Sequence, residues 1–148
     1  MFVWASIAGV LVVAFLGWNL YRRFGSDRIA QLNDGRRATS RMVSRGELVD
    51  GNRHLAVAMA VTESTFFYEN SDMQASLDLE WIREIEYDTA LATGAPVHGG
   101  RVLRLRTDRQ VFEFVLPPDD VSKWYVMLPP RQAARREVAP PQQTVAAT

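Results

Sequence analysis

Cysteine is absent from this 148-residue chain, and histidine occurs only twice, as His54 and His98. Without a thiol the chain can form no disulfide, no thiolate zinc site and no cysteine nucleophile. The two histidines lie far apart, and neither belongs to a metal-binding spacing such as His-Glu-x-x-His. We therefore expect no metal ion or cofactor, and surface positions for both histidines.

Charge is missing from the first 21 residues, which contain no Asp, Glu, Lys, Arg or His. As a helix, a run of this length rises about 30 Å, enough to cross the hydrocarbon core of a bilayer. Trp4, Trp18 and Tyr21 stand near its ends, where aromatic rings prefer the membrane interface. A cleaved signal peptide needs basic residues before the apolar run, and none is present. A buried helix of a soluble protein fits twenty uncharged terminal residues poorly. We predict that residues 1–21 form an uncleaved transmembrane helix.

Positive charge lies on one side of this run only. The N-terminal side carries only the α-amino group, whereas the C-terminal side is followed by Arg22, Arg23, Arg28, Arg36, Arg37, Arg41 and Arg45. The positive-inside rule places that side in the cytoplasm. The predicted location is the inner cell membrane, with a single pass, the N-terminus outside and the soluble part in the cytoplasm.

The formal net charge is zero, but the charges are unevenly spread. Residues 22–53 hold eight arginines against four acids, and residues 63–88 hold eight acids against Arg83 alone. Basic residues near an anionic bilayer are each attracted by about 1 kcal/mol, and acids are repelled. The basic and the acidic stretch could also be solvated surfaces without any specific partner. A net charge of zero argues against binding of nucleic acid. The candidate contacts with anionic lipid are Arg22, Arg23, Arg36 and Arg37.

Beyond a basic linker over residues 22–37, with a helical stretch at 27–33, the chain is patterned as strands. The clearest runs from residue 54 to 62, where Leu55, Val57, Met59 and Val61 alternate with alanines. A glycine-rich loop is expected over residues 92–100. The alternation of Glu84, Glu86 and Asp88 would place an acidic patch on one strand face. The other strands are predicted at residues 38–45, 66–69, 74–79, 83–88, 101–107 and 110–116.

After the last predicted strand, the spacing of apolar residues changes from every second residue to that of a helix. Pro117, Pro118, Asp119 and Asp120 form a helix-start signal, with Asp at the cap and in the first turn. Apolar residues follow at helical spacing until two prolines end the segment. Residues 129–148 are rich in Pro, Ala and Gln and are predicted to be disordered. The residues at helical spacing are Val121, Trp124, Tyr125 and Leu128, with Trp124 as the predicted buried anchor. The aromatic residues assigned to the core are Phe66, Phe67, Tyr68, Trp81, Phe112, Phe114 and Trp124.

Three segments resemble the GRAM and bacterial pleckstrin-homology-like (PH-like) domains. Residues Ala60–Asn70 are similar to their hairpin, and Leu77–Tyr87 to the next strand with its Ile-x-x-Ile step. Phe112–Phe114, followed by Asp120 and Trp124, resembles their last strand and C-terminal helix. The resemblance covers residues 38–128 and implies a barrel of about seven antiparallel strands closed by a C-terminal helix. One departure is Glu63-Ser64-Thr65, where relatives often carry basic residues, and it weakens an inherited expectation of phosphoinositide binding.

Three classes of function remain open. The favoured one is a non-catalytic interaction or scaffold module tethered to the membrane, as an accessory subunit of a larger complex with a protein partner. The second is a lipid-sensing module that reads anionic headgroups through its arginines. The third is an enzyme, for which the sequence offers no catalytic residues that we recognise. The predicted organisation is a transmembrane helix at 1–21, a linker at 22–37, the domain at 38–128 and a tail at 129–148.

Overall fold

The computed structural model describes residues 27–132. The predicted transmembrane helix at 1–21 lies outside this range, and so does most of the tail at 129–148 that was predicted to be disordered. Its first residues, 129–132, are described, and Arg131 pairs with Ile85 of the sheet. Among residues 27–132, no helix has the length and apolar character needed to cross a membrane.

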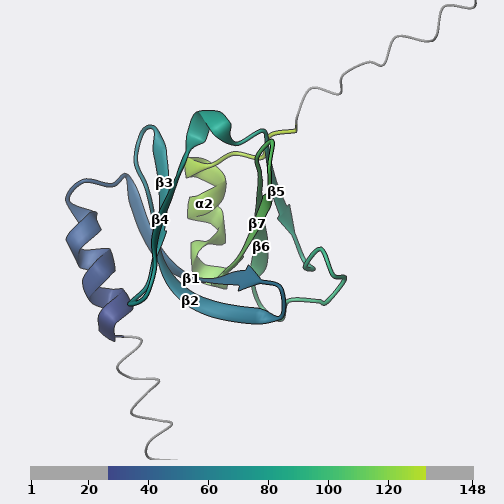
Figure 1. Ribbon diagram of the computed structural model, residues 1–148, viewed down its shortest axis with the longest axis horizontal. Coiled ribbons are helices and arrows are strands. Elements are labelled where there is room, and N and C mark those ends of the chain that lie inside the picture. The colour runs from purple at the N-terminus through teal and green to yellow at the C-terminus, as the bar shows by residue number, and fades with distance from the viewer. Residues whose placement is uncertain (1–26, 133–148) are drawn as a thin grey trace, which may run out of the picture.

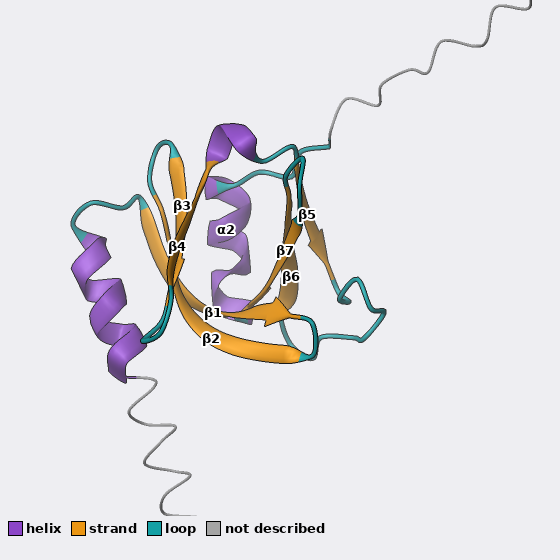
Figure 2. Ribbon diagram, viewed as in Figure 1, coloured by secondary structure: helices purple, strands orange, loops and turns teal. Residues whose placement is uncertain are grey.

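The described region is a half-barrel made from one curled antiparallel sheet, with a short helix in its opening (Figures 1 and 2). The sheet has seven strands in the order β4-β3-β2-β1-β7-β6-β5. This confirms the predicted mainly-β architecture with a C-terminal helix. The elements are β1 (Met42–Asp50), β2 (Arg53–Val61), β3 (Thr65–Glu69), β4 (Gln74–Asp78), the 3-10 helix η1 (Leu79–Trp81), β5 (Glu84–Asp88), β6 (Arg101–Arg106), β7 (Val111–Leu116), the 3-10 helix η2 (Pro118–Asp120) and α2 (Val121–Met127).

The strand register decides which side chains face the inside of the curl. Met59 of β2 lies opposite Tyr68 of β3, and Leu48 of β1 lies opposite Phe114 of β7. Directly opposed residues point to the same face of a sheet, so the large member of each alternating pair collects on the concave side. The core is therefore the concave face plus α2. Its side chains with no measurable exposure include Val57, Met59, Phe66, Leu103, Leu105, Phe114, Leu116 and Trp124.

Helix α2 fills the opening of the half-barrel through Trp124, which is fully buried as predicted. The Trp124 ring lies 5.7 Å from the ring of Phe66 in an edge-to-face arrangement. Beside α2, Tyr87 stacks on Tyr125 at 3.9 Å and donates a 2.8 Å hydrogen bond to the carbonyl of Leu128. Burial, with a smaller contribution from Tyr125, raises the pKa of Tyr87 above its ordinary value. The end of α2 is thus tied to β5.

A second helix, over residues 27–37, packs on the convex face of the sheet (Figure 1). Ile29 and Asn33, one helical turn apart, are its buried residues. Ala58 and Ala60 of β2 lie on the convex face and are nevertheless buried, opposite Glu69 and Phe67, which Arg36 of this helix contacts. Small side chains at these positions let the helix approach the strands closely. The helix extends beyond the predicted stretch 27–33.

The structure corrects four expectations. Phe67 was assigned to the core but lies opposite Ala60 on the convex face, because Phe66 and Tyr68 occupy the core-facing positions of β3. The first strand was predicted at 38–45 but occupies Met42–Asp50, because pairing with β2 holds Gly46 and Glu47 in extended form and Glu47 pairs with β7 as well. Trp81 was assigned to the core but is 63% exposed, because it belongs to η1 outside the sheet. Asp120 stands at the N-cap of α2 without a capping hydrogen bond, since its carboxylate accepts from Lys123 Nζ at 2.7 Å.

Candidate functional site

A groove of about 870 Å³ lies on the convex face, and we call it the outer groove. Strands β1, β2 and β7 form its floor, with Glu47, Ala56 and Val115 among the residues there. The helix at 27–37 forms one side through Arg28, and the loop before β6 forms another through His98. Arg28 and Arg45 are its arginines, so the groove could accept an anionic group.

Both histidines line this groove, although they are far apart in the sequence. His54 is exposed, and its Nδ1 lies 3.1 Å from Oε2 of Glu47 across the β1–β2 pair. His98 is also exposed, in the loop, so the surface positions predicted for both are confirmed. Among residues 27–132, no group of three His, Cys, Asp or Glu side chains is placed to hold a metal ion.

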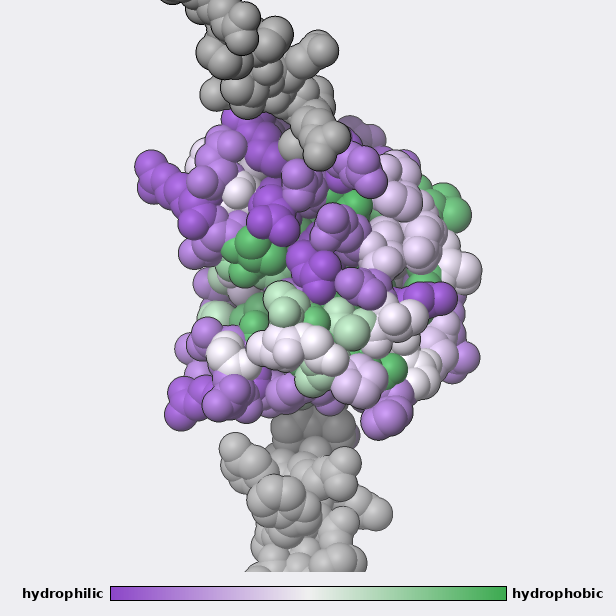
Figure 3. Space-filling model, turned by 90° about the vertical axis from the view of Figure 1, so that its right-hand side faces the viewer, coloured by the Kyte–Doolittle hydropathy of each residue, from purple (hydrophilic) through white to green (hydrophobic). Residues whose placement is uncertain are grey.

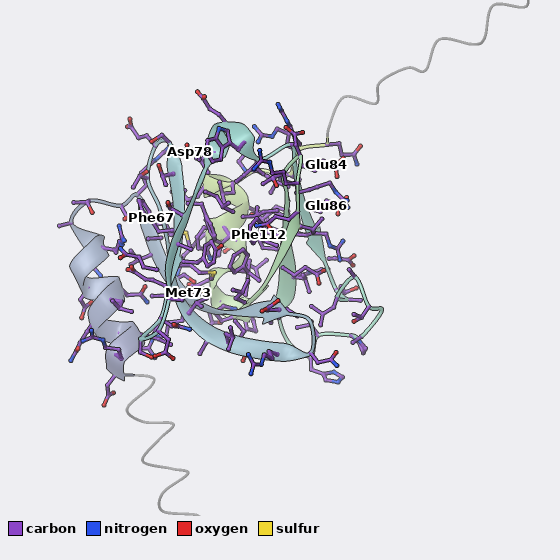
Figure 4. The ribbon with its side chains drawn as sticks, viewed as in Figure 1. Phe67, Met73, Asp78, Glu84, Glu86 and Phe112 are labelled. Carbon is purple, nitrogen blue, oxygen red and sulfur yellow. The ribbon has the colours of Figure 1, made fainter. Side chains whose placement is uncertain are left out.

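Arg36, a candidate lipid contact, is directed into the protein. Its Nε and Nη2 donate to the carboxylate of Glu69 at 2.9 and 3.1 Å, and its guanidinium lies 4.0 Å above the ring of Phe67. The hydrogen bonds that Arg36 donates to Glu69 raise the pKa of Arg36, with burial acting in the opposite direction. Figure 4 shows Phe67 on the side of the sheet that faces the helix at 27–37, whereas Phe112 lies on the inner side of the half-barrel. Arg36 therefore fastens the helix at 27–37 to β3.

The other three candidates are placed differently. Arg37 lies on the exposed side of the same helix and pairs loosely with Asp34, at 3.4 Å, with 72% of its own side chain exposed. Arg22 and Arg23 lie outside the described residues. The structure thus turns Arg36 toward the sheet and leaves Arg37 in solvent, so only Arg37 of the two is available to a membrane surface.

The predicted acidic patch on β5 is present in position, but each of its carboxylates is paired with an arginine of β6. Arg104 of the neighbouring strand β6 reaches Glu86 at 3.1 Å and Asp88 at 3.4 Å, and Glu113 of β7 at 2.9 Å. Arg106 pairs with Glu84 at 2.6 Å. Backbone N–H groups that follow Asp88 lower its pKa. In Figure 3 this side of the molecule is largely hydrophilic, with separate apolar patches.

A second, smaller groove lies at the end of the half-barrel where β4 passes into η1. It has a volume of about 490 Å³, and we call it the Trp81 groove. Leu77, Trp81 and Phe112 supply its apolar walls, and the β6–β7 turn supplies polar ones. Exposed aromatic residues beside an apolar hollow are common features of protein-binding surfaces.

Sequence reasoning missed the Trp81 groove and placed Trp81 in the core. The signal that could have found it was the run Asp78-Leu-Glu-Trp81, in which Trp81 falls between strands and follows the acid Glu80. The outer groove carried no such signal, because its residues come from several segments that only the fold brings together.

Comparison of this chain with protein families, curated proteins and solved structures gives no match.

Proposed function

We propose that this protein is a membrane-tethered, non-catalytic module with a PH-like fold whose domain binds another protein. The observation that carries the proposal is Trp81, a tryptophan 63% exposed beside an apolar groove at the end of a sheet. A large aromatic ring left in water is characteristic of binding surfaces, where tryptophan contributes strongly to affinity. The commitment of Arg36 to Glu69 also removes one of the arginines expected to contact lipid.

The PH-like assignment is supported by the element order together with the resemblance of residues 38–128. Seven antiparallel strands curl around a C-terminal helix that carries a buried tryptophan, the arrangement that the resemblance implies. The tether is supported by the uncharged run at 1–21 and the arginines that follow it. An accessory role in a membrane complex on the cytoplasmic face would use both parts.

The tether and its orientation are tested together in cells. We expect the full chain to remain in the membrane after carbonate washing, and a reporter fused after Thr148 to behave as cytoplasmic, because arginines are retained on that side. Residues 1–21 should be present in the purified protein by intact-mass measurement. Recovery of a soluble form that begins after residue 20, or activity of a reporter that works only outside the cytoplasm, would contradict the proposal.

A lipid-sensing function is the second candidate, and the outer groove favours it. Arg28 lies at this groove, a few residues after Arg22 and Arg23, and Arg45 lines it as well. A membrane held close to the start of the helix at 27–37 would approach this side of the domain. In that case the groove would accept an anionic headgroup, with Arg28 and Arg45 supplying the charge.

Vesicle co-sedimentation distinguishes the two candidates. We expect residues 27–132, without the anchor, to bind anionic vesicles weakly or not at all at about 0.15 M salt, where charges beyond about 8 Å are screened. Two or three exposed arginines at about 1 kcal/mol each give only marginal binding. The fragment includes Arg131 because its backbone pairs with Ile85. Tight, headgroup-specific binding that is lost in Arg28→Ala and Arg45→Ala would reverse the order of the candidates.

A further inference from the structure

The half-barrel has two sheet edges, β4 and β5, and they are in different states. At β5, Ile85 exchanges two backbone hydrogen bonds with Arg131, at 2.7 and 2.9 Å. The Arg131 side chain also donates to the carbonyls of Leu79 and Ile82. The chain itself thus covers part of that edge, whereas β4 pairs only with β3 among residues 27–132.

The register shows which backbone groups of β4 point outward. Leu79 donates to the carbonyl of Ser64 and Asn70 donates to that of Met73, so the odd-numbered residues of this stretch bond to β3. In an antiparallel ladder the intervening residues point the other way. The N–H and C=O groups of Gln74, Ser76 and Asp78 therefore face away from the sheet. Figure 4 labels Met73 and Asp78 at the two ends of this edge.

Edges of this kind are commonly protected, and β4 has little protection of its own. Charged side chains, proline and bulges keep other strands off an exposed edge. In the sequence Gln-Ala-Ser-Leu-Asp of β4 the only charged residue is Asp78, proline is absent, and the pairing with β3 is continuous, without a bulge. Shortness is the main safeguard, since β4 has five residues. The edge leads directly into the Trp81 groove, where Leu77 lies beside Trp81.

The charge around this edge indicates what would bind there. Its exposed carboxylates form no ion pair within residues 27–132, unlike the acids of β5, which are held by Arg104 and Arg106. An anionic membrane would be repelled from this side. Two β4 edges from two copies would bring like charges together. A basic strand would meet complementary charge. The carboxylates concerned are Glu63, Asp72, Asp78 and Glu80.

We propose that the β4 edge binds an extended, basic segment of a partner protein as an added strand, with an apolar side chain of that segment in the Trp81 groove. Backbone hydrogen bonds to Gln74, Ser76 and Asp78 supply affinity, and the carboxylates select arginine or lysine. This inference rests on the proposed protein-binding function and names the chemistry of its partner.

The test uses the full chain in detergent micelles and a short peptide of alternating arginine and valine. We expect binding that slows amide hydrogen exchange at residues 74, 76 and 78. Ser76→Pro removes an outward N–H that the isolated domain does not use, so the fold should persist with an unchanged melting temperature. Its affinity for the peptide should fall roughly tenfold or more, since an added strand loses hydrogen bonds there. Ser76→Ala, which keeps the N–H, should bind as the unaltered protein does.

Two altered peptides test the proposal without changing the protein. Replacement of arginine by glutamate should weaken binding roughly tenfold or more. N-methylation of alternate amides keeps the charge but prevents strand pairing, and should weaken it similarly. Equal binding of the N-methylated peptide, no effect of Ser76→Pro, or no binding at all would each overturn the proposal.

Two other occupants of the β4 edge are distinguished by the same measurements. Protection of the amides of residues 74, 76 and 78 in the full chain but not in a chain ending at Gln132 would make the C-terminal tail the occupant. A dimer abolished by Ser76→Pro would make it a second copy, and either result overturns the proposal. Failure of the peptide test leaves the vesicle result unaffected. Failure of this inference can therefore be distinguished from failure of the proposed function.

Discussion

Trp124→Ala is expected to unfold the domain at physiological temperature or leave it barely stable. Trp124 has no exposed surface and is the only fully buried residue that α2 contributes. Truncation of a buried tryptophan typically costs about 3–5 kcal/mol, against a total stability of about 5–15 kcal/mol for a small domain. Each kcal/mol shifts the melting temperature by roughly 4–8 °C in a domain of this size. Thermal unfolding of residues 27–132, followed by circular dichroism, measures the loss.

Trp124→Phe is the matched control. The indole Nε1 of Trp124 has no hydrogen-bond partner in the part of the chain that the structure describes, so phenylalanine loses volume but no such bond. We expect it to keep the edge-to-face contact with Phe66 and to cost less than half as much as alanine. An unchanged melting temperature in Trp124→Ala would mean that α2 does not pack in the half-barrel.

Arg36→Met is expected to destabilise the same fragment by about 3 kcal/mol. The pair is largely enclosed, with side-chain exposures of 21% for Arg36 and 8% for Glu69. Removal of one partner leaves a buried carboxylate without its counter-ion, which typically costs about 3–5 kcal/mol, and the exposure of Arg36 favours the lower end. The contact with Phe67 and the attachment of the helix at 27–37 are weakened as well. Denaturant unfolding measures this loss.

Two variants show whether the buried pair is the cause. Arg37→Met, on the exposed side of the same helix, breaks only a surface pair and should change stability by less than about 1 kcal/mol. The double variant Arg36→Met with Glu69→Leu removes both charges and should recover much of the loss, because apolar replacements of a buried pair are often tolerated. Equal effects of Arg36→Met and Arg37→Met would contradict the structural role of Arg36.

Alternation of residue size was enough to predict most of the strands. In β2, the large residues Val57, Met59 and Val61 and the alanines between them occupy opposite faces, and one face had to be the core. The helical spacing that ends in Trp124 was equally informative. The weakest prediction was β1, because Arg45, Gly46 and Glu47 show no alternation. Their extended form comes from pairing with β2, and Glu47 pairs with β7 on its other side as well.

The candidate sites depended far more on the fold. Periodicity tells which residues share a face, but it does not tell which distant segment covers that face. Arg36 and Glu69 are 33 positions apart, and only the docking of the helix at 27–37 makes a predicted lipid contact into an internal ion pair. The acids of β5 were foreseen, but Arg104 opposite them was not, since cross-strand register is invisible in a single sequence.

The sequence by itself determined the properties that depend on neighbours along the chain: the uncharged first 21 residues, the uneven charge, the alternating strands and the final amphipathic helix. The tertiary structure decided which strands lie at the edges, that Arg131 covers one edge and not the other, and that Trp81 lies outside the core. Each of these depends on contacts between residues far apart in the chain. Hydrophobic pattern restricts such contacts only through the total surface that must be buried, so many pairings satisfy the same pattern and the packed fold selects one.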